Sequence, residues 1–464
     1  MRDVELLMPA GNLEKLEYAV RYGANAVYLG VVDFSLRAMR KGSLITMENL
    51  KQAVDLAHSL GAKAYVTINI FAFNNDIKQL ETCLDKFKDA NPDAFIVSDY
   101  GIFNMIRKNI PNIPIHVSTQ TNTLNYESVK FWRDLGASRV ILARELAIDD
   151  IAEIRRQVPD IELECFVHGA QCVSFSGRCL LSDYFSKGER KANHGNCSQP
   201  CRWSYKLVEE TRPNEYLEIN QDGRGSHILS PKDLCLVKQL PQLIDAGVDS
   251  FKVEGRTKSL YYVSAVAKTY RQAIDEVLEN PFADMEKYFL ELQKVGNRGY
   301  TTGFALGDNN GESYSYDISK GLAGADFLCE FQGAAKQLGS EAAKSSHTPS
   351  PDGEGWDGVI SSNNSETPQT YQSDTVLSPN RPIALSPNYF LVKIKNKMHV
   401  NNEVEIITPK EQFRAVVESI KNEDGDELEV GNTNDDVYIK FSKAPEDYRY
   451  AIARTVGIKN PAVV

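Results

Sequence analysis

The run MENLKQAVDLAHSLGAKAYVTINI, residues 47–70, decides the fold because it joins an amphipathic helix to a short apolar strand. Its first part, Met47–Leu60, carries apolar residues at helical spacing, and Ala64–Ile70 alternates between two faces as a strand does. A strand that directly follows a helix is typical of parallel α/β proteins, in which helices connect neighbouring strands. The fold therefore depends on how often this unit recurs along the chain.

The same alternation extends in both directions from this run. We expect strands at Glu5–Met8, Ala26–Leu29, Ala64–Ile70, Ala94–Ser98, Ile115–Ser118, Val140–Ala143, Glu162–Val167 and Ser250–Glu254. Helical patterns fill the intervals at Leu13–Tyr22, Met47–Leu60, Ile77–Lys88, Gly101–Lys108, Tyr126–Leu135, Ile148–Gln157, Asp233–Ala246 and Ser259–Leu278. These strand–helix units, over roughly the first 300 residues, predict an α/β fold, a (β/α)8 TIM-like barrel.

One face of the expected strands is unusually polar near the C-terminal ends. The polar positions are Tyr28, Asn69, Ser98, Ser118, Gln120, Arg144, His168, Lys252 and Glu254. In a barrel this face points inward, and active sites form at its C-terminal rim. A buried polar network is the structural alternative, but so many polar groups are costly to bury without a purpose. We therefore expect a polar ligand or substrate at the rim.

The composition divides the chain into a barrel at 1–310 and a C-terminal domain at 311–464. The barrel contains a cysteine-rich insertion at about 169–230, and the C-terminal domain contains a flexible, Ser- and Pro-rich insertion at about 334–386. Short strands are expected at Phe327–Phe331, Tyr389–Ile394, Glu403–Ile407, Arg414–Ser419, Val437–Phe441 and Tyr448–Ala453. They predict that the C-terminal domain is small and all-β.

Size and charge exclude several classes of protein. With 464 residues, 42% of them hydrophobic, the chain can form two or three domains and a sizeable core. Its start resembles no signal peptide and no apolar run approaches membrane-spanning length, so we expect a cytoplasmic protein with no membrane partner. A net charge of −11 argues against a surface that is basic overall, but it permits a local basic patch for nucleic acid.

Five cysteines in or just after the long insertion suggest a metal site: Cys172, Cys179, Cys197, Cys201 and Cys235. Cytoplasmic thiols stay reduced, so a disulfide framework is not expected. An iron–sulfur cluster, a zinc ion and ordinary buried thiols are the three interpretations that remain open. Ser230-Pro231 predicts the start of the Asp233–Ala246 helix, which would carry Cys235 in its first turn to the same rim as Cys172.

Several long motifs make the chain resemble the collagenase-like peptidase family U32. The longest is Glu164-x-Phe166-x-x-Gly169-Ala170-x-Cys172-x-x-x-x-Gly177-x-Cys179-x-Leu181-Ser182. The other matching runs are Pro9-Ala10-Gly11, His116-Val117-Ser118-x-Gln120, Lys252-Val253-Glu254-Gly255-Arg256 and Arg298-Gly299-Tyr300-Thr301-x-Gly303-Phe304. The resemblance covers nearly the whole chain. Gln171 departs from it, because an aliphatic residue is usual before the first cysteine.

The resemblance implies an enzyme of oxygen-independent hydroxylation that holds a 4Fe–4S cluster and uses prephenate as co-substrate and small-molecule oxygen donor. The chain is most similar to the branch that converts the wobble uridine of tRNA to 5-hydroxyuridine, so tRNA is the implied partner. Other branches act on ribosomal RNA or a ubiquinone precursor. The family's cluster ligands correspond to Cys172, Cys179, Cys197 and Cys235, and Cys201 is an alternative fourth ligand. An electron or sulfur-cluster partner is also implied.

The candidate catalytic residues at the rim are Arg144, Glu254, Arg256 and His168. The two arginines suit bidentate clamping of the carboxylates of a prephenate-like dianion. The structural alternative is that they pair with Glu145 and Glu254. For His168, donation to the substrate or cluster and a purely structural role both remain open.

RNA contact and proteolysis depend on different residues. Trp203 and Tyr205, with Arg190, Lys191 and Arg202, suit stacking on bases and neutralising phosphates, and a solvated loop is the alternative. The C-terminal domain is also expected to hold tRNA. No His-Glu-x-x-His or Gly-x-Ser-x-Gly run is present, although a dispersed triad is recognised only by geometry. A collagenase-like peptidase and a non-catalytic RNA-binding protein with structural zinc are thus the alternatives to hydroxylation.

Overall fold

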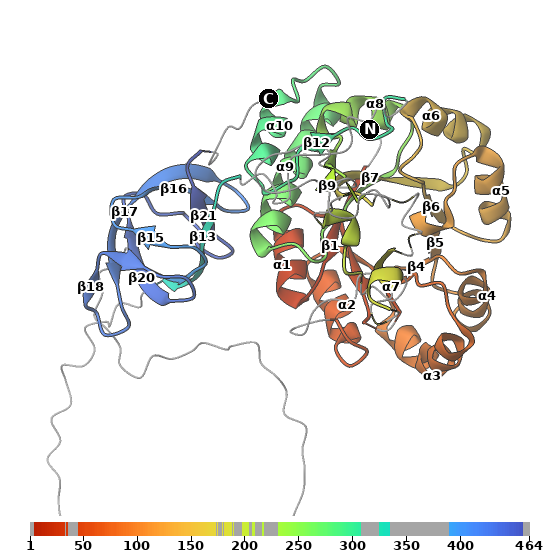
Figure 1. Ribbon diagram of the computed structural model, residues 1–464, viewed down its shortest axis with the longest axis horizontal. Coiled ribbons are helices and arrows are strands. Elements are labelled where there is room, and N and C mark those ends of the chain that lie inside the picture. The colour runs from red at the N-terminus through yellow and green to blue at the C-terminus, as the bar shows by residue number, and fades with distance from the viewer. Residues whose placement is uncertain are drawn as a thin grey trace, which may run out of the picture. The chain divides into compact units, whose positions relative to one another are not determined.

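The fold was established from a computed structural model of the chain (Figure 1). The structure describes residues 4–32, 34–35, 45–172, 174, 179, 181–187, 189, 197–203, 207–208, 216–217, 231–307, 324–334 and 389–457. Most of the cysteine-rich insertion and the insertion expected at about 334–386 lie outside these residues. Among the residues so described, no helix combines the length and the apolar character needed to cross a membrane.

Eight parallel strands form a closed barrel, which confirms the predicted fold class. They are β1 (Glu5–Ala10), β2 (Ala26–Gly30), β3 (Lys63–Ile68), β4 (Ala94–Val97), β5 (Ile115–Val117), β6 (Arg139–Ile141), β7 (Glu162–Ala170) and β11 (Ser250–Val253). Each strand pairs in parallel with the next, and β11 closes the ring by pairing with both β7 and β1. All eight C-terminal strand ends therefore meet at one rim.

Helices surround the barrel (Figure 1). They are α1 (Leu13–Arg21), α2 (Leu50–Ser59), α3 (Asn74–Ala90), α4 (Tyr100–Asn109), α5 (Tyr126–Asp134), α6 (Ile148–Gln157), α8 (Leu240–Asp245), α9 (Leu260–Glu279) and α10 (Glu286–Gln293). Side-chain caps fix several helix starts, as when Asp99 accepts backbone N–H groups of α4 and Ser259 accepts one of α9. The apolar strand side chains Val66, Ile68, Ile70, Val117 and Val253 are all fully buried.

The expected helix at Asp233–Ala246 is wrong in its first half. Asp233–Cys235 forms strand β10, which pairs antiparallel with the end of β7 and in parallel with β12 (Tyr300–Thr301). A turn of 3-10 helix, η5 (Val237–Gln239), follows, and α8 starts only at Leu240, with Pro241 in its first turn. Pro241, and not Pro231, therefore marks the helix start. The residues before the helix form a strand because they pair with the end of β7.

The C-terminal strands form an antiparallel sheet in the order β16-β21-β13-β14-β20-β17-β18, which confirms the predicted β domain. Their bounds are β13 (Phe327–Ala334), β14 (Tyr389–Ile394), β16 (Glu403–Ile407), β17 (Gln412–Lys421), β18 (Glu427–Leu428), β20 (Asp436–Phe441) and β21 (Ile452–Thr455). Strand β15 (Met398–His399) pairs separately with β19 (Val430–Gly431). The strand expected at Tyr448–Ala453 begins later, at Ile452.

Contacts divide the chain into two compact units. One comprises Met1–Phe327, Glu405–Phe413 and Tyr450–Val464, and the other comprises Leu328–Val404 and Arg414–Arg449. Within the first unit, the fully buried Arg454 contacts the carboxylates of Glu291 and Glu405 and donates to the hydroxyl of Tyr261. Residues near the end of the chain thus complete the packing around α9 and α10. The predicted boundary at residue 310 stays a prediction.

Candidate active site at the barrel rim

Arg144 and Glu254 meet at the rim, just beyond the ends of β6 and β11. Arg144 Nη1 donates to the carbonyl oxygen of Ala170 at 2.9 Å, and Arg144 Nη2 lies 3.9 Å from Glu254 Oε2. The guanidinium also lies over the ring of Phe166, with Cζ 3.8 Å from the ring centroid. These contacts hold the Arg144 side chain in place, and its exposure of 15% leaves it accessible to a ligand.

Arg256 is more deeply buried than Arg144. Its Nη1 donates to Ser35 Oγ at 2.8 Å and to Thr67 Oγ1 at 3.3 Å, and its guanidinium carbon lies 5.9 Å from the Tyr28 ring centroid. Space for this arginine depends on Gly30, since a Cβ there would stand 1.4 Å from Arg256 Nη1. The rim position of both arginines could be predicted from the sequence, but the need of Arg256 for Gly30 could not.

His168 lies inside the wall of the rim and is only 1% exposed. Its Nδ1 is 3.4 Å from the hydroxyl of Tyr270, and its Nε2 is buried with no hydrogen-bond partner among the residues that the structure describes. The rings of Tyr262 and Tyr300 also pack against it. Burial, with a smaller contribution from Lys258, lowers the pKa of His168 to about 3, so the imidazole is neutral at pH 7. This site favours a structural or hydrogen-bonding histidine over a charged one.

The backbone directly after His168, still within β7, lies close to Glu254, the residue that follows β11. Gly169 has a φ of +105°, and a Cβ there would stand 2.3 Å from the carbonyl oxygen of Glu254. The hydroxyl of Tyr262 donates to that same oxygen at 2.7 Å. Only glycine permits both the backbone conformation and this approach, which explains why the motif needs Gly169 next to the histidine.

The structure describes five cysteines of the candidate metal site, but their environments differ. Cys172 and Cys197 are exposed, Cys179 and Cys201 are half-buried, and Cys235 is buried. Burial raises the pKa of the Cys235 thiol to about 12, and its Sγ lies 4.0 Å from the Tyr270 hydroxyl. Within the described ranges, no three His, Cys, Asp or Glu side chains are grouped closely enough to hold a metal ion.

The chemistry of two of these thiols fits a soft-metal group. The backbone N–H of Leu181 donates to Cys179 Sγ at 3.4 Å, and that of Gln199 donates to Cys197 Sγ at 3.3 Å. N–H groups directed at sulfur stabilise thiolate ligands and tune the potential of iron–sulfur clusters. Cys235 reaches the rim through β10, where its Cα pairs with that of His168, and not through a helix as expected. The thiols fit the implied cluster as donors, and their assembly around it stays a prediction.

Sequence reasoning missed a charged network deeper in the barrel. Arg139 contacts three carboxylates, those of Glu5, Glu162 and Glu164, at 2.6 to 3.0 Å. Lys252 Nζ lies 2.8 Å from the fully buried Glu164. Lys252 was expected to face a ligand, but it belongs to a buried polar network, which was the structural alternative. The sequence signal for this network is the presence of charged residues near the strand starts, such as Glu5, Arg139 and Glu164.

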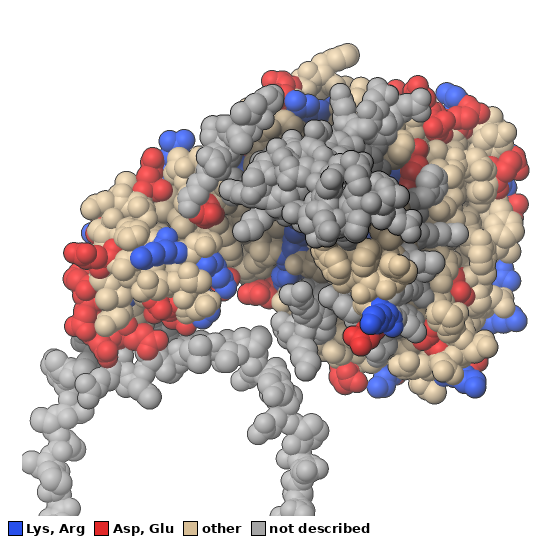
Figure 2. All heavy atoms as spheres, in the orientation of Figure 1, with Lys and Arg blue, Asp and Glu red and all other residues tan. Residues whose placement is uncertain are grey.

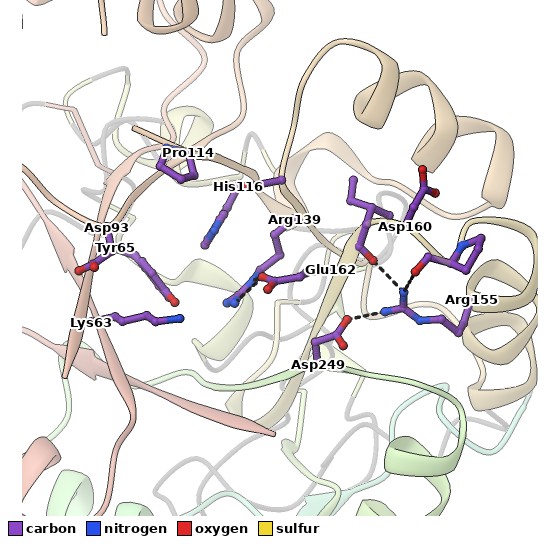
Figure 3. Close-up of a pocket in the computed structure, with 13 residues that line it drawn as sticks. Lys63, Tyr65, Asp93, Pro114, His116, Arg139, Arg155, Asp160, Glu162 and Asp249 are labelled. Carbon is purple, nitrogen blue, oxygen red and sulfur yellow. Dashed lines mark hydrogen bonds and ion pairs between the residues drawn. The ribbon is translucent and has the colours of Figure 1, made fainter. Parts of the chain in front are cut away.

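A pocket of about 550 Å³ opens at the opposite, N-terminal end of the barrel (Figure 3). Its wall includes Lys63, Tyr65, His116 and Arg139, and its edge carries Arg155 bound to Asp249. Burial, assisted by Arg139, Lys252 and Lys63, lowers the pKa of His116 well below its ordinary value. Charged side chains at this end of a barrel serve stability, whereas active sites form at the other rim.

Two surface features bear on nucleic-acid contact. Exposed aromatic side chains gather in the cysteine-rich insertion, where Phe185 packs against both Tyr184 and Trp203 at ring-centroid distances of 5.4 and 5.7 Å. Figure 2 shows acidic residues crowding the part of the C-terminal domain around β18, and the exposed ones there include Glu423, Asp424 and Asp426. Of the other residues expected to contact RNA, the basic Arg190 and Lys191 and the aromatic Tyr205 lie outside the described residues, as does the side chain of Arg202.

The family of the chain follows from comparison with known proteins. The family model of Peptidase family U32 matches residues 11–315, and that of the Peptidase family U32 C-terminal domain matches residues 383–454. The chain therefore belongs to peptidase family U32, as its motifs indicated.

Curated relatives within this family carry several names. The tRNA hydroxylation protein P of Escherichia coli (strain K12) is 33% identical over 96% of this chain and 94% of its own length. The tRNA hydroxylation protein P of Haemophilus influenzae is 40% identical over 72% of this chain and 81% of its own length. Two further relatives match a smaller part of this chain: the 23S rRNA 5-hydroxycytidine C2501 synthase of Escherichia coli, 34% identical over 67% of this chain and 47% of its length, and the Collagenase of Porphyromonas gingivalis, 32% identical over 67% of this chain and 76% of its length.

Proposed function

We propose that this protein is an RNA hydroxylase whose substrate is tRNA. The observation that carries the proposal is the end-to-end similarity to the Escherichia coli tRNA hydroxylation protein P, which spans both the barrel and the C-terminal domain. The similarity to an rRNA 5-hydroxycytidine synthase supports the same class of reaction on RNA. The reacting base in this proposal is the wobble uridine, and the product is 5-hydroxyuridine.

Prephenate is the co-substrate in this proposal, and the rim supplies groups that suit it. Prephenate carries two carboxylates, and Arg144 offers an accessible guanidinium that Phe166 and Ala170 hold in position. Arg256 lies on the same rim with its planar fork oriented by Ser35 and Thr67. Glu254, close to Arg144, would be displaced from it or would orient it when a carboxylate binds. His168 remains neutral and shapes the wall.

An iron–sulfur cluster would be held by Cys172, Cys179, Cys197 and Cys235. A cluster of this kind supplies one-electron redox chemistry at a potential set by its ligands and their hydrogen bonds. The N–H donors to Cys179 and Cys197 support these two ligands, and Cys201, which lies in a short 3-10 helix, η4 (Pro200–Arg202), stays an alternative fourth ligand. The electron or cluster-delivery partner that such a centre requires is part of the proposal.

RNA would approach the barrel rim from the side of the cysteine-rich insertion. Stacking on aromatic rings is the sequence-tolerant way in which proteins hold single-stranded bases, and Tyr184, Phe185 and Trp203 are exposed there. The acidic residues around β18 repel phosphates, so that tip of the C-terminal domain is not the tRNA-binding face. Any contact of this domain with tRNA would use another surface.

Reconstitution under strictly anaerobic conditions tests the proposal directly. Purified protein loaded with iron and sulfide is incubated with tRNA from cells that lack 5-hydroxyuridine and with a redox mediator in place of the electron partner, with and without prephenate, and the nucleosides are measured by mass spectrometry. We expect 5-hydroxyuridine only with prephenate and only with the loaded protein. Cys172→Ser should bind little iron and form no product. A fully active Cys172→Ser protein would contradict the role of the cluster.

Proteolysis is the second candidate, because one relative is named Collagenase. Gelatin cleavage that survives removal of iron but is lost on replacing Arg144 or Glu254 would favour a peptidase. Stoichiometric zinc without iron after anaerobic purification would instead favour an RNA-binding protein with a structural metal.

A further inference from the structure

Ser182 lies between two cysteine segments that the sequence separates. It belongs to the short helix α7 (Leu181–Phe185), directly after the Cys179 segment, and it is fully buried. Its Oγ accepts the backbone N–H of Ser198 at 2.9 Å and lies 3.1 Å from Ser198 Oγ. Ser198 directly follows Cys197, so one hydroxyl joins the two segments.

The joined residues are neighbours of the two N–H groups that point at sulfur. Leu181, which donates to Cys179 Sγ, precedes Ser182, and Gln199, which donates to Cys197 Sγ, follows Ser198. Each cysteine thus accepts from the residue two positions further on, and the two turns are held against each other through the serine pair. A shift of either segment would move a thiol together with its N–H donor.

We infer that Ser182 is a positioning residue that aligns Cys179 and Cys197 as ligands of the same centre. The inference rests on the proposed function, since the centre is the cluster assigned there. It gives a physical role to the last residue of the long family motif, Ser182, which neither the rim chemistry nor the choice of ligands explains. Partners of metal ligands of this kind are typically worth about 10- to 100-fold in metal affinity.

The contact itself can be tested on cluster-free protein. Hydrogen–deuterium exchange measured by mass spectrometry on peptides that cover residues 197–203 should show protection at the Ser198 amide in the unmodified chain. Ser182→Ala removes the acceptor, so this amide should exchange faster. Ser198→Ala keeps its own N–H and should retain most of the protection. Equal exchange in the Ser182→Ala protein and the unmodified chain would overturn the inference at this step.

The consequence for the centre is tested on reconstituted protein. Iron and sulfide content, the visible absorption of the cluster and its rate of loss to a chelator are compared for the unmodified chain, Ser182→Ala and Ser264→Ala. Ser264 is the matched control, because it is also fully buried and its hydroxyl donates to the carbonyl oxygen of Leu260 within helix α9. We expect about 10- to 100-fold faster iron loss in Ser182→Ala and no change in Ser264→Ala.

The outcomes separate the inference from the function on which it rests. Iron bound by the unmodified chain and retained equally by Ser182→Ala would overturn the positioning role alone. Failure of the unmodified chain to bind iron would overturn the cluster, and the positioning role with it. Equal loss in Ser182→Ala and Ser264→Ala would reduce Ser182 to an ordinary buried serine.

Discussion

Gly30 and Arg256 show what a single residue decides in this barrel. Arg256 could be predicted as a rim residue because it follows a strand and a motif with alternating polarity. Gly30 could not, because the clash of 1.4 Å that a side chain would cause depends on how β2 lies against the turn after β11. That is a contact between residues far apart in the sequence, and no local pattern reports it.

Gly30→Ala should therefore disable the rim without unfolding the barrel. The added methyl group displaces the Arg256 guanidinium from Ser35 and Thr67, and misplacement of a binding group by about 1 Å can cost about 100-fold in rate. The check is prephenate-dependent formation of 5-hydroxyuridine, with circular dichroism as the measure of folding. Gly296→Ala is the control, since a Cβ there meets nothing within 4 Å. An unchanged rate in Gly30→Ala would show that Arg256 does not need its present position.

At the scale of elements, most strands and helices could be predicted from periodicity. The exception is β10, which was predicted as the start of a helix because periodicity carries no information on tertiary pairing. The run Leu234–Leu236 has no period of its own and was assigned to the helix that follows. Its strand conformation in β10 comes from pairing with β7, which continues to Ala170 beyond the other barrel strands. The same pairing places Cys235 beside His168, so the tertiary contact also decides where a candidate ligand lies.

Strands β7 and β11 are joined inside the barrel by the ion pair between Glu164 and Lys252, and this pair should be essential to the fold. Lys252→Met leaves the buried carboxylate of Glu164 with Arg139 as its remaining ion-pair partner among the described residues, and breaking a buried pair from one side costs up to about 3–5 kcal/mol. We expect a loss of this size in the free energy of unfolding in urea. The double variant Lys252→Met/Glu164→Leu should recover much of it, because no unpaired charge remains. A double variant as unstable as the single one would argue that shape, and not charge, matters here.

At the scale of the whole molecule, acid should destabilise the protein earlier than carboxylates alone would allow. The folded-state pKa of His116 lies well below the ordinary value of 6.5, so below that pH the unfolded chain binds a proton that the folded chain does not. Stability from this group is complete above 6.5 and is lost as the pH falls, by up to about 1.4 kcal/mol per unit. Burial opposes ionisation of Glu5, but Arg139 outweighs it and the pKa of Glu5 is lowered; the stability from Glu5 is complete above its ordinary pKa of 4.5 and is lost only below that pH.

His116→Gln should therefore flatten the stability profile between about pH 6.5 and pH 5, without removing it. A second slope remains, because His168 is also held neutral, with a pKa of about 3. Urea unfolding of cluster-free protein across this range measures both slopes. Identical profiles for His116→Gln and the unmodified chain would mean that His116 takes up its proton without loss of structure.

The molecule as a whole could be predicted in outline, and its site only in part. Strand number, barrel closure and the C-terminal β domain follow from repeated patterns along the chain. The cysteines were visible as residue types at close spacing, yet spacing does not tell which thiols come together in space, and Cys235 reaches the rim on strand β10 instead of on the expected helix. The interior ion pairs could not be predicted, because their partners lie on different strands and no pattern within one strand reports the pairing.

Nucleoside mass spectrometry of total RNA from a deletion strain and a complemented strain, each grown with and without oxygen, tests the central claim most directly. Growth without oxygen matters because an oxygen-dependent enzyme can mask the loss. We predict that 5-hydroxyuridine derivatives in tRNA fall in the deletion strain and return with the unmodified chain, but not with Cys172→Ser. Unchanged tRNA nucleosides under both conditions would contradict the claim, and a loss of 5-hydroxycytidine from ribosomal RNA instead would move the substrate to that RNA.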